Sequence, residues 1–80
     1  MTNKNEDIFQ ELKDEVAAHI RAARAYRNMK QSEVAKAAGV SPKSISLIEQ
    51  GKANARIGTI GKILAAMGYR LMLGLNNKKE

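Results

Sequence analysis

Polar and basic side chains in the middle of the chain have the types and the spacing of a nucleic-acid-binding surface. Lys43, Ser46 and Gln50 lie three or four residues apart, so a helix would present them on one face. Ammonium and amide groups bind base edges in a DNA major groove. Three further polar residues follow and suit phosphate contacts: Lys52, Asn54 and Arg56. For each residue taken alone, an ordinary solvated surface is the alternative.

The sequence offers no comparable set of residues for catalysis or for metal binding. The chain has no cysteine and a single histidine, His19. Three neighbouring carboxylates are most simply a solvated helix face: Glu11, Asp14 and Glu15. The short run from Gly58 to Lys62 lacks the spacing and the hydroxyl residue of a phosphate-binding loop. We therefore expect no enzyme, no metal site and no cofactor.

Residues 31–51 have the pattern of two short helices joined by a tight turn. Apolar residues recur at helical spacing in both segments: Val34, Ala35 and Ala38, then Ile45 and Ile48. Gly39 suits the left-handed turn between them. Ser41 can cap the second helix, and Pro42 falls at its first position. The pattern predicts a helix-turn-helix, whose second helix enters the major groove.

The flanking segments predict further helices. One long helix, or two in close succession, is expected from about Asn5 to Arg27, with Asn5 capping its start. A last helix is expected from Arg56 to Met67, ended by Gly68. A minimal domain needs only residues 17–68, so residues 1–16 are read as an acidic amphipathic extension.

The residues after Gly68 alternate as in a strand. Apolar side chains occupy every second position: Tyr69, Leu71, Leu73 and Leu75. A lone strand has no partner, so we expect residues 69–75 to pair with the same strand of a second subunit. An extra turn of helix or a frayed tail is the alternative. Residues 76–80 are read as a polar tail.

Length and charge fit one small DNA-binding domain. The 80 residues carry a net charge of +6, divided into −3 over residues 1–16 and +9 over residues 17–80. The helix-turn-helix part is thus the basic part, as a phosphate-facing surface should be. No apolar run resembles a signal peptide or a membrane span, so we expect a cytoplasmic protein without membrane contact.

With these elements placed, residues 20–67 resemble the Xre/phage-repressor (Cro/CI-type) family of helix-turn-helix proteins. The resemblance rests on the ungapped spacing of Met29-Lys30-Gln31, Gly39-Val40-Ser41, Ile45-Ser46 and Ile48-Glu49-Gln50-Gly51. It implies an all-α domain of five helices that acts as a homodimer on palindromic double-stranded DNA operators. The ending Ala65-Ala66-Met67-Gly68-Tyr69-Arg70-Leu71 looks like antitoxins of the HipB type, which pair through a strand after the last helix.

The resemblance also implies roles for single residues. Gln31 matches the position that grips the DNA backbone, and Arg24 matches an arginine that pairs with Glu49. Two positions depart from the family: Lys30 replaces a capping Ser or Thr, and Pro42 replaces a polar or basic residue. The full expected DNA-binding set is Gln31, Ser32, Ser41, Pro42, Lys43, Ser46, Leu47, Gln50, Lys52, Asn54 and Arg56.

The sequence therefore predicts a DNA-binding transcriptional repressor. The leading specific role is the autoregulating antitoxin of a toxin–antitoxin module, with a toxin protein as its second partner. The alternatives are a stand-alone prophage or restriction-system regulator and, in another class, a protein-interaction module that does not bind DNA.

Overall fold

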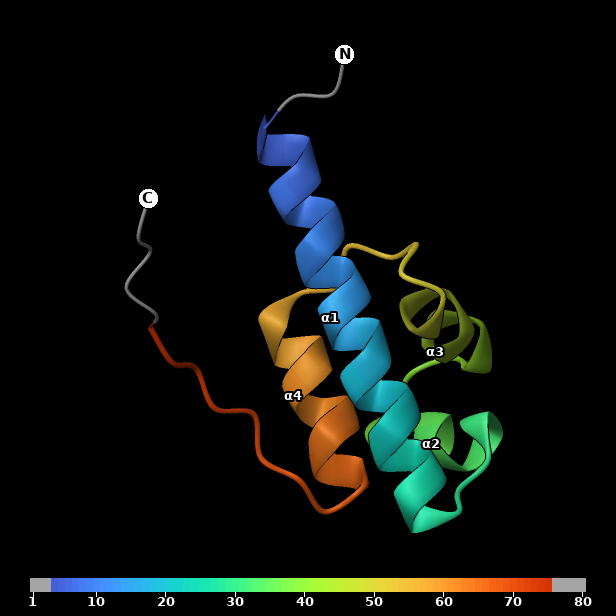
Figure 1. Ribbon diagram of the computed structural model, residues 1–80. Coiled ribbons are helices and arrows are strands. Elements are labelled where there is room, and N and C mark those ends of the chain that lie inside the picture. The colour runs from blue at the N-terminus through green and yellow to red at the C-terminus, as the bar shows by residue number, and fades with distance from the viewer. Residues whose placement is uncertain (1–3, 76–80) are drawn as a thin grey trace.

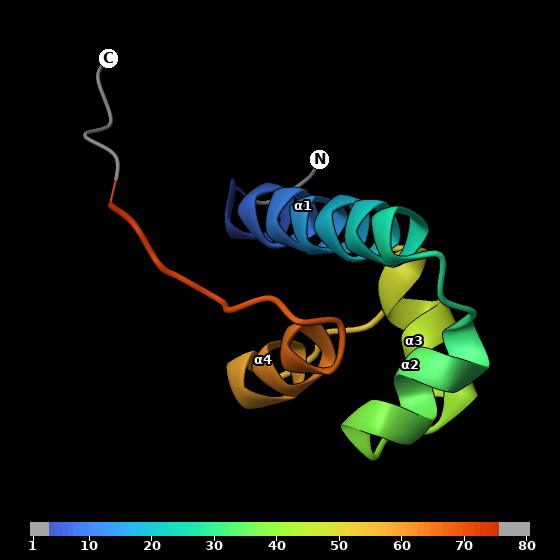
Figure 2. The same cartoon turned by 90° about the horizontal axis from the view of Figure 1, so that it is seen from below.

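Four helices make up the part of the chain that the structure describes. The computed structural model describes the backbone of residues 4–75 and the side chains of residues 8–75. Helix α1 spans Lys4–Arg27, α2 spans Gln31–Ala38, α3 spans Pro42–Glu49 and α4 spans Ile57–Ala66. Helix α1 lies across one side of the molecule, with α3 and α4 on either side beneath it (Figures 1 and 2). Helix α2 packs against both α3 and α4.

The core is a small aliphatic cluster to which every helix contributes. Ile20, Val34, Ile45 and Ile63 are its largest fully buried side chains, one from each helix in chain order. Small Ala23 and Ala35 let the helices approach closely, and Ile48 and Met67 complete the cluster. The low aromatic content of the chain is consistent with this aliphatic core.

The turn between α2 and α3 forms as its residues predict. Gly39 has a φ of 73°, the left-handed conformation that ends α2. The Ser41 hydroxyl accepts a hydrogen bond from the Ser44 N–H at 3.1 Å, which caps α3, and Pro42 follows at the first helical position. These predictions of the helix-turn-helix are confirmed.

Helix α1 is one continuous helix, and the expected total of five helices is wrong for residues 4–75. No glycine or proline lies between Lys4 and Arg27, so nothing in the sequence breaks or kinks it. Asn5 lies inside the helix, and the expected N-cap at Asn5 is also wrong. Asn28 has a φ of 55° directly after α1, the left-handed conformation that ends the helix. None of the four helices is long and apolar enough to cross a membrane.

The segment that follows α4 has no regular secondary structure between residues 69 and 75. A strand needs the backbone groups of a neighbouring strand, and the described part of this single chain offers none. Tyr69 is half-buried against the core, and the Arg27 guanidinium lies 4.8 Å from the centre of its ring. The expected strand is therefore absent within one chain, and pairing across a dimer remains a prediction. Residues 76–80, the expected polar tail, lie outside the described residues.

The first half of α1 projects beyond the other helices (Figure 1). Ile8, Phe9 and Leu12 are exposed there, and Val16 is half-buried. Among the described side chains, that of Gln10 ties this half to the domain, because its amide donates to the Gly51 carbonyl at 3.1 Å. The extension is thus the continuation of a core helix rather than a separate segment.

Candidate nucleic-acid interface

Helix α3 turns one face to the core and the opposite face to solvent. Ile45 and Ile48 are buried, while Lys43 and Gln50 are exposed. Ser46 is half-buried and lies between them on the outer face. The structure thus leaves a short row of hydrogen-bonding side chains open on a helix of eight residues.

Two residues of this row contact each other. The Gln50 Nε2 donates to the Ser46 Oγ at 2.9 Å, across one helical turn. This bond leaves one N–H of the Gln50 amide and its carbonyl oxygen unused by this contact. Lys43 belongs to the same face, and its ammonium has no carboxylate within ion-pair distance among the described residues. The row can therefore donate and accept hydrogen bonds at once, which is what base edges require.

Four residues of the expected set are less open than the others: Gln31, Ser46 and Leu47 are half-buried, and the Ser41 hydroxyl is already hydrogen-bonded. Leu47 is half-buried, so its side chain is partly occupied by the protein itself. The hydroxyl of Ser41 is engaged with both the N–H and the hydroxyl of Ser44. Pro42 and Ser32 are exposed.

The start of α2 is capped by the side chain of a residue within the same helix. The Glu33 Oε1 accepts a hydrogen bond from the Lys30 backbone N–H at 2.7 Å. This is one of the two bonds of a capping box, the one from the N-cap backbone N–H to the glutamate side chain, and it forms although Lys30 has no hydroxyl to supply the other. A Lys side chain cannot accept a hydrogen bond, so the Lys30 ammonium takes no part in the cap and is exposed. In the sequence, the signal for this cap was Glu33, a glutamate three residues after the N-cap position of α2.

A buried carboxylate, Glu49, joins three elements around the turn. Its side chain is 4% exposed and accepts from Arg24 Nε at 2.7 Å and from Arg24 Nη2 at 2.9 Å, a bidentate pair. The Gln31 Nε2 donates to the Glu49 Oε1 at 3.1 Å. Arg24 also donates to the Met29 carbonyl at 3.0 Å. The end of α1, the start of α2 and the end of α3 are thus held by one charged group.

Arg21 adds a second link between α1 and α3, because its guanidinium donates to the backbone carbonyl of Glu49. Sequence reasoning missed this residue. Its signal was the spacing of three between Arg21 and Arg24, which places both side chains on one face of α1. The link satisfies a carbonyl at the end of α3 that has no partner within the helix.

The charge of Glu49 is held by its partners. Burial by itself raises the pKa of this carboxyl, but the hydrogen bonds from Arg24 and Gln31 and the charges of Arg24 and Arg21 outweigh burial and lower it. The hydrogen bond to Glu49 raises the pKa of Arg24, against the effect of its own desolvation. Both groups are therefore charged at neutral pH, and Gln31 is oriented by a permanent negative charge.

The loop after α3 alternates between solvent and core. Ala53 and Ala55 are half-buried and pack against the core cluster. Three polar residues between and beside them are exposed, in agreement with a phosphate-facing role: Lys52, Asn54 and Arg56. The loop begins at Gly51, which is buried and has a φ of 72°. The row on α3, the start of α2 and this loop together form the candidate interface.

Comparison with known proteins places the whole of this interface within one family match. Residues 20–73 match the family model HTH_3, described as helix-turn-helix. No curated protein matches the chain. The matched stretch contains α2, α3, α4 and the loop between the last two, together with residues 20–27, the last third of α1.

Proposed function

Because this chain belongs to the HTH_3 family of helix-turn-helix proteins, we propose that it is a sequence-specific DNA-binding regulator whose α3 enters the major groove. The single observation that carries the proposal is the exposed row of Lys43, Ser46 and Gln50 on a helix fixed by the Glu49 contacts. A rigid helix with an open polar row can hold several donors and acceptors in register with base edges.

Base reading is assigned to the row on α3. Lys43 lies near the helix start and contacts guanine O6 and N7. Gln50 offers the amide that pairs with an adenine edge, once its bond to Ser46 opens or Ser46 itself joins the contact. Leu47 and Pro42 contribute apolar contact at the edge of this row, with Leu47 limited by its partial burial.

Backbone contacts are assigned to the residues around α3. Gln31 sits at the first position of α2, where free backbone N–H groups also attract phosphate. Glu49 holds one N–H of the Gln31 amide, so the second N–H is presented in a fixed direction. The remaining proposed contacts to the DNA backbone are Ser32, Ser41, Lys52, Asn54 and Arg56.

A dimer on a palindromic site completes the proposal. One α3 of eight residues covers only a few base pairs, so a single domain has limited discrimination. Two copies related by a two-fold axis would read half-sites about 34 Å apart. The regulator would then repress by covering a promoter.

The experiment begins by selecting the preferred site from a pool of random duplexes. Lys43→Ala should weaken binding to the selected site by about 1–3 kcal/mol and relax the preference at one base pair. Lys62→Ala is the matched control, since Lys62 is an exposed lysine on α4 outside the helix-turn-helix. It should leave affinity within a few-fold of the parent.

Salt dependence tests the phosphate contacts separately. If Lys43, Lys52 and Arg56 of each subunit neutralise phosphates or lie close to them, the logarithm of affinity should fall with log salt at a slope of roughly −5. Equal losses for Lys43→Ala on every sequence would make Lys43 a phosphate contact only. A selection without enrichment, together with a slope near zero, would refute DNA binding and favour a protein-interaction module.

A narrower proposal is the antitoxin role. Its support is the resemblance of residues 65–71 to the ending of HipB-type antitoxins. The test is the neighbouring reading frame: its product should arrest growth when expressed alone, and co-expression of this chain should restore growth. Growth arrest that this chain fails to relieve, or no such reading frame, would favour a stand-alone regulator.

A further inference from the structure

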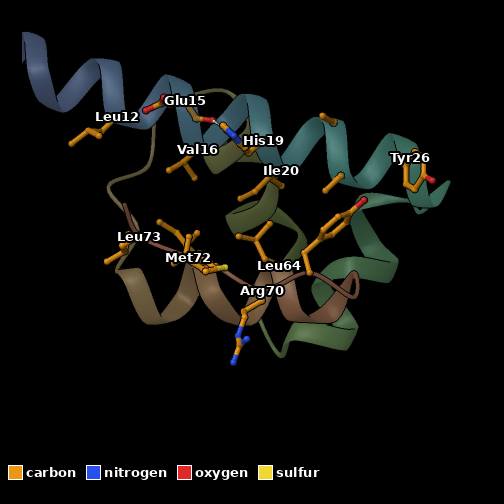
Figure 3. A pocket seen from close by; sticks show the side chains of 15 residues that line it. Leu12, Glu15, Val16, His19, Ile20, Tyr26, Leu64, Arg70, Met72 and Leu73 are labelled. Carbon is orange, nitrogen blue, oxygen red and sulfur yellow. Dashed lines mark hydrogen bonds between the residues drawn. The ribbon is translucent and has the colours of Figure 1, made fainter. Parts of the chain in front are cut away.

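An apolar groove runs along α1, and none of the proposed DNA contacts lines it. Its volume is about 820 Å³, and its walls are α1 from Leu12 to Tyr26 on one side and α4 with residues 69–73 on the other. Figure 3 shows Val16 and Ile20 pointing from α1 toward Leu64 of α4. Lys43, Ser46 and Gln50 do not line it.

A second hollow of about 370 Å³ continues the groove toward the projecting half of α1. The two hollows share five apolar residues: Leu12, Val16, Ile60, Leu71 and Leu73. The second hollow extends to Phe9, which is 56% exposed, beside Leu12, which is 52% exposed. The same face thus carries an apolar hollow and, next to it, an apolar helix end that protrudes.

The exposed apolar area is that of a protein interface. Six large side chains on this face are at least 43% exposed: Ile8, Phe9, Leu12, Ile57, Met72 and Leu73. At about 200 Å² for a fully exposed large side chain, they leave on the order of 700 Å² open, close to the roughly 800 Å² that one partner gives to a standard interface. A patch of this size exceeds the roughly 300–600 Å² that is usual on a monomer.

The charges along α1 make the helix complementary to itself in antiparallel orientation. Residues 8–16 carry three carboxylates against one lysine, whereas residues 17–27 carry three arginines and no carboxylate; Arg21 and Arg24 are engaged with Glu49, and Arg27 lies beside Tyr26 at the groove. In an antiparallel pair, the acidic half of each helix lies beside the basic half of the other, and the helix dipoles oppose. Arg27, and Arg70 at the rim, supply positive charge near the end of the groove that Tyr26 lines.

We propose that this groove binds the projecting half of α1 of a second copy of the chain, with Phe9 and Leu12 of each copy seated in the groove of the other. A hollow and a protruding apolar helix end on one face give the self-complementary contact that a two-fold axis requires. With the axis near Val16, an antiparallel pair places Phe9 of one copy opposite Ala23 of the other, and Leu12 opposite Ile20, between the two ends of the groove. This interface rests on the dimeric regulator proposed above and gives it a site of assembly other than strand pairing.

The test is the oligomeric state of the full 80-residue chain without DNA, measured by sedimentation equilibrium. Phe9→Asp should weaken the dimer by about 30-fold or more, the range of a buried aromatic hot spot. Because Phe9 is more than half exposed in the single chain, circular dichroism at monomeric concentrations should show an unchanged fold. Leu75→Asp is the matched control: Leu75 is fully exposed and lines neither hollow, so its dimer should be unchanged.

Cysteine cross-linking tests the antiparallel orientation. The chain has no cysteine, so single-cysteine variants report one contact each. Lys13→Cys mixed with His19→Cys should form a mixed disulfide under mild oxidation, in preference to either homodimer, because the axis lies midway between these positions. Lys13 is half-buried and His19 is exposed, and each lines one of the two hollows. Predominant Lys13→Cys homodimers would refute the antiparallel pair.

Three results would overturn the interface. A dimer that Leu75→Asp breaks and Phe9→Asp spares would place the contact at a strand formed by residues 69–75. A chain that is monomeric at all concentrations would remove the second copy as occupant. If the chain is monomeric and Phe9→Asp abolishes only its binding to another protein, the groove is the binding site of that protein. The Phe9→Asp variant should still bind a duplex with one half-site in every case. If the parent chain itself fails to bind that duplex, the proposed DNA binding is refuted rather than the interface.

Discussion

The Glu49 contacts make a quantitative prediction about Arg24. Arg24→Met keeps the length and the apolar stem of the side chain but removes both hydrogen bonds to Glu49, at 2.7 and 2.9 Å. The carboxylate then remains buried with Gln31 as its side-chain donor. Removing one partner of a buried ion pair costs about 3–5 kcal/mol, because the remaining charge is left without compensation. Since the Arg24 side chain is 25% exposed, the lower end of this range applies.

That loss is large against the stability of a domain of this size. At roughly 0.05–0.15 kcal/mol per residue, 80 residues have a free energy of unfolding of about 4–12 kcal/mol. Urea denaturation followed by circular dichroism at pH 7 measures the change through the midpoint and slope. Arg24→Met should therefore shift the urea midpoint well below that of the parent.

The double variant Arg24→Met with Glu49→Leu separates charge burial from packing. Replacing a buried pair by apolar residues is often neutral, so the double variant should recover at least about 2 kcal/mol relative to Arg24→Met alone. The DNA affinity of the double variant should be lower than that of the parent chain, because Gln31 has lost the carboxylate that orients it. If Arg24→Met costs under about 1 kcal/mol, or if the two substitutions are additive, the uncompensated-charge reasoning is refuted.

Three further predictions concern single features of the fold. The partners of Glu49 lower its pKa in the folded state. Its contribution to stability is therefore present above the pKa of the unfolded chain, about 4.5, and is lost as pH falls through the lower pKa of the folded chain. In acid denaturation followed below pH 4.5, the double variant should lose less stability than the parent. Gly51→Ala should cost about 1–2 kcal/mol through its φ of 72°, and its new Cβ would also displace the Asp14 Oδ1, now 2.6 Å from that position. Gly39→Ala has a φ of 73° and open space, so its cost in urea denaturation should be the smaller of the two. Ser41→Ala should lower the free energy of unfolding by about 1 kcal/mol through loss of the α3 cap; an unchanged urea midpoint would contradict that cap.

The helix-turn-helix was predictable because its signals are local. Gly39, Ser41 and Pro42 act on the backbone next to them, and the structure has the turn, the cap and the helix start at these residues. The cap of α2 was equally local, but it runs backward from Glu33, and attention to Lys30 alone missed it.

The parts that sequence reasoning could not place depend on contacts between distant residues. The Arg24–Glu49 pair was expected only from the family resemblance, and the contacts of Gln31 and Arg21 with Glu49 were not expected. Glu49 receives hydrogen bonds from residues 18 and 25 positions away, and no periodicity encodes that convergence. Alternation in residues 69–75 is compatible with a strand, but a strand also needs a neighbour, which one chain does not specify. The exposure of Phe9 and Leu12 follows from where α1 outruns the other helices, a matter of relative lengths in three dimensions.

The continuity of α1 has a mechanical consequence. An unbroken helix rises about 1.5 Å per residue, so Phe9 sits about 16 Å along a stiff rod from Ile20, which is anchored in the core. The same rod carries Arg21 and Arg24, whose guanidiniums hold the end of α3. A tilt of a few degrees about Ile20 moves the free end by more than an ångström and shifts both guanidiniums with it. A partner bound to the outer half of this helix would therefore move Arg21 and Arg24, and with them the end of α3.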